Sequence, residues 1–279
     1  MLIGRRLNDY QTNYGTRCRL LGRRHVRGFA IFAHVSTPHI WKLAIQQTEF
    51  CQMKGLQKLA GIAAIFQGLI YIAAFVYFGA FWSYPVDGSP VEKMTYMAEN
   101  QLLFSMIYFL MYVVFGVFLA ILVIGMYERL KHKVNPLITI GSLFGGIWVG
   151  LVIASGMISN IGLDHAIDLM DANPEKALDM WIIVSVITES IGGGNELVGG
   201  LWVLLISVAA IQEGRLPRSP NYLGYFVGIA GIATIYPDKL FTEIFGVSQI
   251  VWFIWLGICL LTEENANKSI QQTANASAD

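Results

Sequence analysis

The sequence has few charged residues and few cysteines. Asp, Glu, Lys and Arg make up 14% of its 279 residues, whereas about a quarter is typical of soluble domains, and the mean hydropathy is +0.54. This composition excludes an ordinary soluble domain and predicts a polytopic membrane protein. Cys18, Cys51 and Cys259 show no paired spacing, which disfavours both a disulfide framework and a CxxC metal or redox site.

Several chemical motifs are also missing. No GK[ST] follows the three glycines at 192–194, and neither a GxSxG elbow nor an HExxH pair is present. His132 and His165 fall between the apolar segments, which disfavours a membrane haem with paired histidine ligands. No basic patch marks a folded face for nucleic acid. We therefore expect no cofactor, no metal site, no catalytic residue and no nucleic-acid partner.

Six apolar segments are long enough, or nearly so, to cross a bilayer, which takes about 20 residues. They cover approximately residues 59–81, 102–126, 137–158, 181–210, 222–236 and 245–261. The fifth is the shortest, because Pro237, Asp238 and Lys239 interrupt it. The predicted fold is all-α, a polytopic membrane bundle of six transmembrane helices over residues 53–262, with the lipid bilayer as its first partner.

Both ends of the chain differ from this bundle. Residues 1–52 contain eight Lys or Arg and two acids, and we expect them to be disordered or a non-native extension that precedes a start at Met53. A transit peptide is the alternative, although Ser36 is the only serine there. A nucleic-acid-binding arm ranks last. Residues 263–279, rich in Asn, Ala, Ser and Gln, are predicted to be a disordered cytoplasmic tail.

Loop charges predict the orientation of the bundle. With Met53 in the cytoplasm, eight basic residues fall on the cytoplasmic side, namely Lys54, Lys58, Arg129, Lys131, Lys133, Arg215, Arg218 and Lys268. The opposite side has Lys93, Lys176 and Lys239, together with an acidic loop between the third and fourth segments. This asymmetry follows the positive-inside rule and predicts that both termini are cytoplasmic.

The fourth segment carries the residues that point to a site. Its middle reads Glu189-Ser190-Ile191-Gly192-Gly193-Gly194-Asn195-Glu196, and none of the six segments has a Lys or Arg in its interior. A charged carboxylate inside the bilayer is costly, so each Glu must be protonated or neutralised by a cation, a cationic ligand or water. We therefore take Glu196, Asn195, Glu189 and Ser185 as candidate ligand- or cation-binding residues, with Glu196 near the midpoint.

Two backbone conformations are possible there. On a continuous helix, the seven-residue spacing would put Glu189 and Glu196 on one stripe, with Ser185 one turn earlier. Alternatively, Gly192, Gly193 and Gly194 form a hinge, and a second half-helix begins near Asn195 with Glu196 in its first turn. Discontinuous helices of this kind line sites in transporters. Close packing of the glycines, with no site at all, is the competing interpretation.

Other residues have weaker signals. Glycines at GxxxG-like spacing, Gly141, Gly145, Gly146 and Gly150 in the third segment and Gly224 and Gly228 in the fifth, predict close helix contacts. Polar groups inside the segments are candidates for lining a site, although each alone is more often a packing residue; they are Gln67, Tyr71, Tyr108, Tyr112, Ser155 and Thr234.

Residues 58–262 resemble a group of uncharacterised bacterial six-span membrane proteins, those with domain of unknown function 4386. The resemblance lies in the run from Ile191 to Trp202, in Leu216-Pro217-Arg218 with Asn221-Tyr222-Leu223-Gly224, and in Gln249-Ile250-Val251-Trp252-Phe253. It implies a helical bundle in the bacterial inner (plasma) membrane. It brings no known activity, cofactor or catalytic residue.

Three functions compete at this stage. The first is binding or translocation of a proton, cation or small amphipathic ligand at the intramembrane carboxylates, which predicts a polar cavity that reaches Glu196. The second is a structural or accessory subunit, whose buried acids meet basic groups of an unknown protein partner. An intramembrane enzyme ranks third, because two acids can act as acid and base, but no nucleophile or metal set accompanies them.

Overall fold

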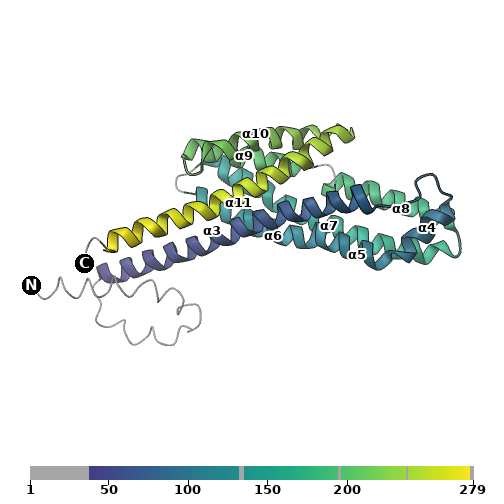
Figure 1. The fold of residues 1–279 in the computed structure, drawn as a ribbon, viewed down its shortest axis with the longest axis horizontal. Coiled ribbons are helices and arrows are strands. Elements are labelled where there is room, and N and C mark those ends of the chain that lie inside the picture. Colours follow the sequence, from purple (N-terminus) through teal and green to yellow (C-terminus); the bar gives the residue numbers. More distant parts are fainter. Residues whose placement is uncertain (1–37, 132–134, 194–195, 237, 277–279) are drawn as a thin grey trace, which may run out of the picture. The chain divides into compact units, whose positions relative to one another are not determined.

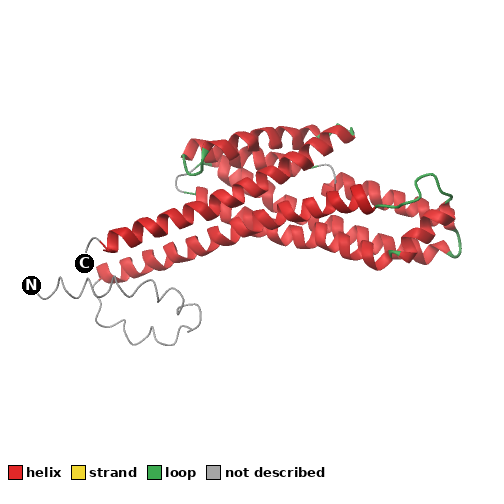
Figure 2. Cartoon of the chain, in the orientation of Figure 1, coloured by secondary structure: helices red, strands yellow, loops and turns green. Residues whose placement is uncertain are grey.

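The structure is a computed structural model that describes residues 38–131, 135–193, 196–236 and 238–276. Side chains are described for residues 55–131, 135–192, 196–236 and 238–262. All regular structure in these ranges is helical, as Figure 2 shows. The all-α prediction is confirmed for this part of the chain.

The helices follow one another with short connections (Figure 1). The α-helices are α3 (Pro38–Val76), α4 (Pro90–Glu99), α5 (Gln101–Tyr108), α6 (Phe115–Leu130), α7 (Pro136–Met170), α8 (Pro174–Thr188), α9 (Leu197–Glu213), α10 (Arg218–Ala233) and α11 (Lys239–Ala276). Three short π-helical segments interrupt or extend them, η1 (Tyr77–Phe81), η2 (Phe109–Val114) and η3 (Glu189–Gly193).

Local sequence explains several helix starts. Proline occupies the first turn of α4, α7 and α8, where its missing N–H costs no hydrogen bond. The residue before each proline caps the helix: the side chain of Asn135 accepts from Leu137 N at 3.0 Å, and that of Asn173 accepts from Lys176 N at 3.0 Å. These caps set where the long helices α7 and α8 begin.

Five helical stretches of the described residues are long and apolar enough to cross a membrane. They are Gly55–Phe81, Gln101–Leu130, Pro136–Met170, Pro174–Glu213 and Lys239–Thr262, which overlap five of the six predicted segments. The remaining predicted segment, at 222–236, corresponds to α10, which has only 16 residues. Composition therefore identified the apolar helices, and α10 falls short of the length that a straight span needs.

Residues 57–262 form one compact unit, and residues 38–56 and 263–276 belong to a second. Both ends were expected to be disordered, but residues 38–52 belong to α3 and residues 263–276 belong to α11. Residues 1–37 and 277–279 lie outside the described residues. That residues 1–52 are a non-native extension stays a prediction.

Helix α7 is the central element of the compact unit and packs against α4, α5, α6, α8, α9, η2 and η3. Glycines permit its closest contacts, since a Cβ on Gly145 would lie 2.7 Å from the Trp202 ring. Gly146 has nothing within 4 Å of such a Cβ, and the same holds for Gly150. Only the Gly141 and Gly145 part of the predicted glycine face is therefore a helix contact.

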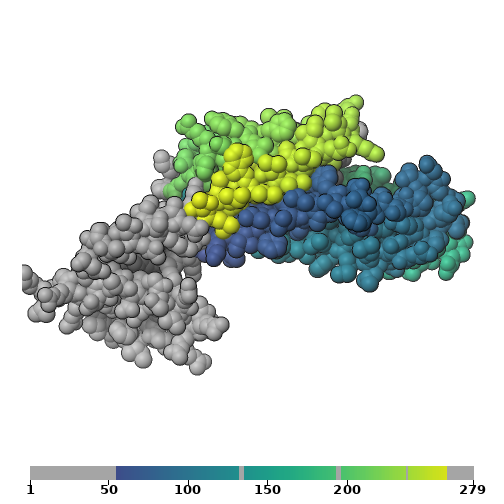
Figure 3. Space-filling model, viewed as in Figure 1, coloured from purple at the N-terminus to yellow at the C-terminus, as the bar shows by residue number. Residues whose placement is uncertain are grey.

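Helices α9 and α10 form a tightly packed hairpin. A Cβ on Gly228 would lie 2.8 Å from Leu204 N, and one on Gly200 would lie 2.8 Å from Gly228 O. This approach agrees with the prediction of close contacts at Gly224 and Gly228. On another face of the unit, α11 lies along α3, yellow against dark blue in Figure 3, with Gly61 next to Gly257.

An aromatic core joins these helices. The rings of Trp148 and Trp202 lie 5.7 Å apart, and those of Trp202 and Trp252 also lie 5.7 Å apart. Phe115 continues the core, with its ring 6.2 Å from Trp148 and 6.0 Å from Phe253. All five side chains are at most 2% exposed. Burial of large aromatic rings supplies much of the packing energy of such a core.

The two ends of the unit differ in charge. At one end, which we call the basic end, the turn between α6 and α7 meets the turn between α9 and α10: Arg129 donates to Arg215 O at 3.0 Å, and Asn135 Nδ2 donates to Glu213 at 3.1 Å. The acidic end comprises the segment 82–100 and the turn between α7 and α8 with the helix residues beside it. Its acids are Asp87, Glu92, Glu99, Asp164, Asp168, Asp171, Glu175 and Asp179.

Candidate functional site

The helix that was expected to cross as the fourth span is discontinuous. Helix α8 passes into η3, Gly192 has φ of +137°, and α9 begins only at Leu197. A positive φ of this size is accessible to glycine and strained for other residues. The broken-helix alternative therefore fits this segment better than a continuous helix, but Glu196 lies directly before α9 and not in its first turn. Gly194 and Asn195 lie outside the described residues.

The two carboxylates do not face the same place, and the prediction of a shared stripe is wrong. Glu196 is 6% exposed, whereas Glu189 is exposed at the surface of η3. The stripe required a regular rotation of 100° per residue between them, and the positive φ of Gly192 breaks that rotation. Ser185 does not join Glu196 either, because its hydroxyl donates to Trp181 O at 2.9 Å on its own helix.

The backbone around Glu196 is held by α10. Its N–H donates to the hydroxyl of Thr234 at 2.9 Å, and that hydroxyl donates to Gly231 O at 2.7 Å. The carbonyl of Glu196 accepts from Gly200 N at 2.7 Å, the first bond of α9. Thr234 is fully buried, so this small network fixes the start of α9 against the end of α10.

The carboxyl group of Glu196 has few partners. Its Oε2 has no hydrogen-bond partner in the described part of the protein, and none of the Lys or Arg side chains described there forms a salt bridge with it. Trp148 lies beside the carboxyl group, but its indole N–H makes no hydrogen bond of ordinary geometry either. A buried carboxyl group without a cation is expensive in its charged form.

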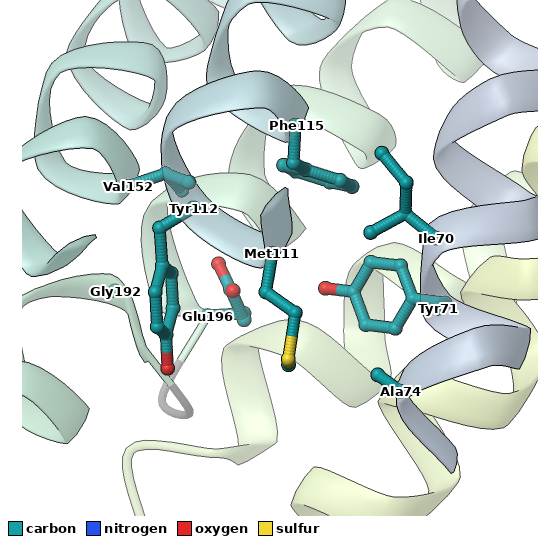
Figure 4. A pocket seen from close by; sticks show the side chains of 9 residues that line it. All are labelled: Ile70, Tyr71, Ala74, Met111, Tyr112, Phe115, Val152, Gly192 and Glu196. Atoms are coloured by element: carbon teal, nitrogen blue, oxygen red, sulfur yellow. The ribbon is translucent and has the colours of Figure 1, made fainter. Parts of the chain in front are cut away.

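Glu196 opens instead onto a small cavity of about 50 Å³. Figure 4 shows its carboxyl group between the rings of Tyr112 and Tyr71, with the Tyr71 hydroxyl pointing into the cavity. The other lining residues are Ile70, Ala74, Met111, Phe115, Val152 and Gly192. The polar groups of the lining thus come from three elements: α3, η2 and the residue before α9.

The sequence identified part of this lining. Tyr71 and Tyr112 were candidates for polar lining residues, and the cavity includes both. Thr234 was also a candidate, but it bonds the backbone of Glu196 rather than lining the cavity. Nothing in the sequence pointed to Met111 or Phe115, because apolar residues in a membrane segment carry no sign of which helix they will face.

The site has no metal-binding character among the residues described. No group of three or more His, Cys, Asp or Glu side chains comes together in those parts of the chain. The cavity contributes one carboxyl group and two phenols. Hard cations such as Ca²⁺ and Mg²⁺ are usually held by six or more oxygen ligands, several of them carboxylates or backbone carbonyls.

Comparison with known proteins identifies no relative. No family model matches the chain, no curated protein matches it, and no solved structure matches it. The site is therefore interpreted from its own geometry: a buried carboxyl group, next to a break in a membrane-type helix, facing a water-sized cavity with two tyrosines.

Proposed function

We propose that this chain is a multi-pass membrane protein in which the carboxyl group of Glu196 binds and releases a proton inside the membrane. The observation that supports it most directly is the environment of Glu196, buried and without a salt bridge in the described residues, yet open to a cavity. Titratable groups that face it are Tyr71 and Tyr112, and Glu189 interacts with Tyr112.

A proton suits this site because it removes the charge. A charged side chain in the membrane interior costs a few kcal/mol or more, and a basic partner normally offsets that cost. No basic side chain fills this role for Glu196 in the described residues. Protonation neutralises the carboxyl group without any further ligand, and deprotonation restores a charge that the surroundings oppose. Such a group can couple proton binding to a change in structure.

The size of the cavity favours a proton over larger ligands. A volume of about 50 Å³ accommodates a few water molecules, since one water needs about 10–15 Å³ on this measure. Pockets for drug-sized ligands are about 300–1,000 Å³. A small amphipathic ligand would need a rearrangement of Met111, Tyr112 or Tyr71. Metal cations are disfavoured because the cavity offers only one carboxyl group and two phenol oxygens as ligands.

The geometry also favours a site over an accessory role. In the accessory hypothesis, the buried acid meets a basic group of a partner protein. The Glu196 carboxyl group is buried and lies at a small cavity between α3, η2 and the residue before α9, so a partner's Lys or Arg would have to enter that cavity to reach it. Water and protons need no such opening.

For the membrane arrangement, we propose six crossings, with α10 as the shortest. Its 16 residues span about 24 Å at 1.5 Å per residue, and 3₁₀-type bonds from Thr234, Ile235 and Tyr236 extend it by another turn. Six crossings place both termini on one side. Because the basic end carries Arg129, Lys131, Arg215 and Arg218, we place it in the cytoplasm of a bacterial cell, with the bundle in the inner membrane. Membership in the resembled family is part of this proposal.

This placement gives the depth of Glu196. Helix α9 has 17 residues, or about 25 Å, between Glu196 and the turn at the basic end. The hydrocarbon core is about 30 Å thick. Measured from that turn, Glu196 lies in the outer half of the core and not at its midpoint. Glu189, seven residues earlier, then lies near the outer interface, where an exposed carboxylate is tolerated.

Infrared difference spectroscopy tests the function. The purified protein in lipid is measured across a pH series, and the C=O stretch of a protonated carboxylic acid is followed. We expect a pH-dependent band that is lost in Glu196→Gln and kept in Glu189→Gln, the matched variant on the same segment. Persistence of the whole band in Glu196→Gln would refute the assignment. A midpoint that moves with Na⁺ or K⁺ concentration at constant ionic strength would indicate a cation site instead.

A further inference from the structure

A file of four tyrosines connects the acidic end with Glu196. Tyr84 follows Trp82 in the segment 82–100, Tyr77 begins η1, Tyr108 ends α5 and Tyr112 lies in η2. The rings of Tyr108 and Tyr112 are stacked with their centroids 6.2 Å apart, and Tyr112 lines the Glu196 cavity. We call Tyr77, Tyr84, Tyr108 and Tyr112 the tyrosine file.

Ring contacts and electrostatic proximity connect its members. Tyr108 stacks on Tyr112 and is also close enough to Tyr77 and Tyr84 to interact with them electrostatically. Tyr112 in turn interacts with Glu196. At the acidic end, Trp82 holds the first members, with its ring 5.5 Å from Tyr84 and 6.3 Å from Tyr77. The four tyrosines therefore form a connected set between the segment 82–100 and the cavity that holds the Glu196 carboxyl group.

The backbone beside the file is unusual. π-Helical turns are rare in proteins and occur frequently at functional sites. Here η1 contains Tyr77, η2 contains Tyr112, and η3 contains Gly192, which lines the cavity. Each of the three described π-helical segments thus supplies a residue of the file or of the cavity. Helix packing alone would not require all three π-helical turns to lie at the tyrosine file or at the cavity.

Three buried tryptophans pack on the other side of Glu196, toward the basic end. Trp148, Trp202 and Trp252 are fully or almost fully buried there, with successive rings 5.7 Å apart. Close-packed indole rings leave little room for water. The tyrosine file has half-buried side chains, and phenol hydroxyls both donate and accept hydrogen bonds. A tyrosine hydroxyl keeps its proton at neutral pH, and burial raises the pKa of Tyr84 further, so this hydroxyl remains a donor.

We infer that the tyrosine file is the route by which protons reach Glu196 from the acidic end. This inference rests on the proposed function. A proton from bulk water enters at Tyr84 and moves through the hydroxyl groups and water between them; each oxygen accepts one proton as it passes its own to the next. The last proton converts the Glu196 carboxylate to a carboxylic acid. One proton is transferred, and no group is oxidised or reduced.

A pH jump measures the rate of this transfer. A caged acid is photolysed, and the Glu196 carboxylic acid band is followed by time-resolved infrared spectroscopy in the full protein in lipid. Tyr108→Phe keeps the ring that packs against Tyr112 and Trp181 but removes the hydroxyl. We expect its protonation rate to fall by about 100-fold, the lower end of what a positioned proton-transfer group contributes, with an unchanged final band.

The control is Tyr222→Phe, on α10, where the tyrosine is 58% exposed and pairs with Tyr225. Its rate should equal that of the wild-type protein. Wild-type rates in both Tyr108→Phe and Tyr77→Phe would overturn the route while the proton site stands. If the wild-type protein shows no Glu196 band at all, the proposed function fails, and the route fails with it.

Discussion

The backbone N–H of Glu196 donates to the side-chain hydroxyl of Thr234, 2.9 Å away and 38 residues later in the chain. This bond connects the break in the fourth membrane-type segment with the end of α10. It positions Glu196 because a buried N–H at the start of a helix has no partner within that helix. The site therefore depends on α10, the helix that is shortest for a crossing.

Replacing Thr234 tests this dependence. Thr234→Val keeps the shape of the side chain but removes the hydroxyl, which leaves the N–H of Glu196 buried without an acceptor. We expect a loss of about 1–3 kcal/mol in the free energy of unfolding. Thr234→Ser retains the hydroxyl and should lose clearly less. Equal stability of Thr234→Val and the wild-type protein, in denaturant unfolding in detergent, would show that the bond is not needed.

The break itself can be tested at Gly192. A Cβ there would lie 3.4 Å from Leu151, an ordinary contact, so the effect of Gly192→Ala comes from the φ of +137°. Such backbone strain costs about 1–3 kcal/mol. Gly146→Ala is the matched control, since Gly146 lies within α7 with open space around it and alanine favours helix by about 1 kcal/mol. Thermal unfolding should therefore move in opposite directions in the two variants, and a shift in the same direction would contradict the broken helix.

The start of α4 should depend on pH. Ser89 N donates to Glu92 Oε2 at 2.7 Å, and this bond, with a smaller contribution from the Ser89 hydroxyl, lowers the pKa of Glu92. A lowered pKa stabilises the folded state above the unfolded value, about 4.3, and this stabilisation is lost as pH falls through the folded pKa. In hydrogen exchange, α4 should be better protected in the wild-type protein than in Glu92→Gln at pH 7, and the difference should shrink near pH 3.

Exposed Glu99 at the last turn of α4 provides the control. Glu99→Gln changes a carboxylate of the same helix that makes no capping bond. Its α4 protection should match that of the wild-type protein at both pH values. A difference between the wild-type protein and Glu92→Gln that stays constant over this range would exclude the charged cap as its cause.

The six-crossing arrangement predicts which turns are cytoplasmic. Single cysteines at Gly214 and Asp87, in a background without Cys18, Cys51 and Cys259, can be labelled with a membrane-impermeant maleimide in intact cells. We expect labelling at position 87 and none at 214 until the cells are opened, because the basic end faces the cytoplasm. Labelling of both positions in intact cells would mean an even number of crossings between them, and would contradict the three that this arrangement places there.

Much of the fold follows from composition. Long runs without charge mark the membrane helices, and the Pro and Asn residues before α7 and α8 mark their starts. The length of α10 was harder to predict. Residues 234–236 continue the apolar segment, but they form a turn after the end of the regular helix. Apolar composition shows that a segment can lie in lipid and does not show where its regular helix ends.

The site was predicted in part. A carboxylate beside three glycines in an apolar segment indicated a break and a buried acid, and Glu196 fits both. Glu189 was wrongly placed beside it, because helical periodicity cannot be carried across a residue with positive φ. Tyr108 and Tyr112 were candidates for lining a site, but their connection with Tyr77 and Tyr84 could not be predicted, because only tertiary packing brings these parts of the chain together.

The most direct test is solid-state NMR of the protein in lipid with ¹³C-labelled glutamate. The Cδ resonance of Glu196, assigned from its loss in Glu196→Gln, is followed across a pH series. We predict that it moves between the positions of a neutral carboxylic acid and a carboxylate, with no dependence on Na⁺ or K⁺. A resonance that keeps the carboxylate position at every pH at which the protein is folded would contradict a proton-binding site at Glu196.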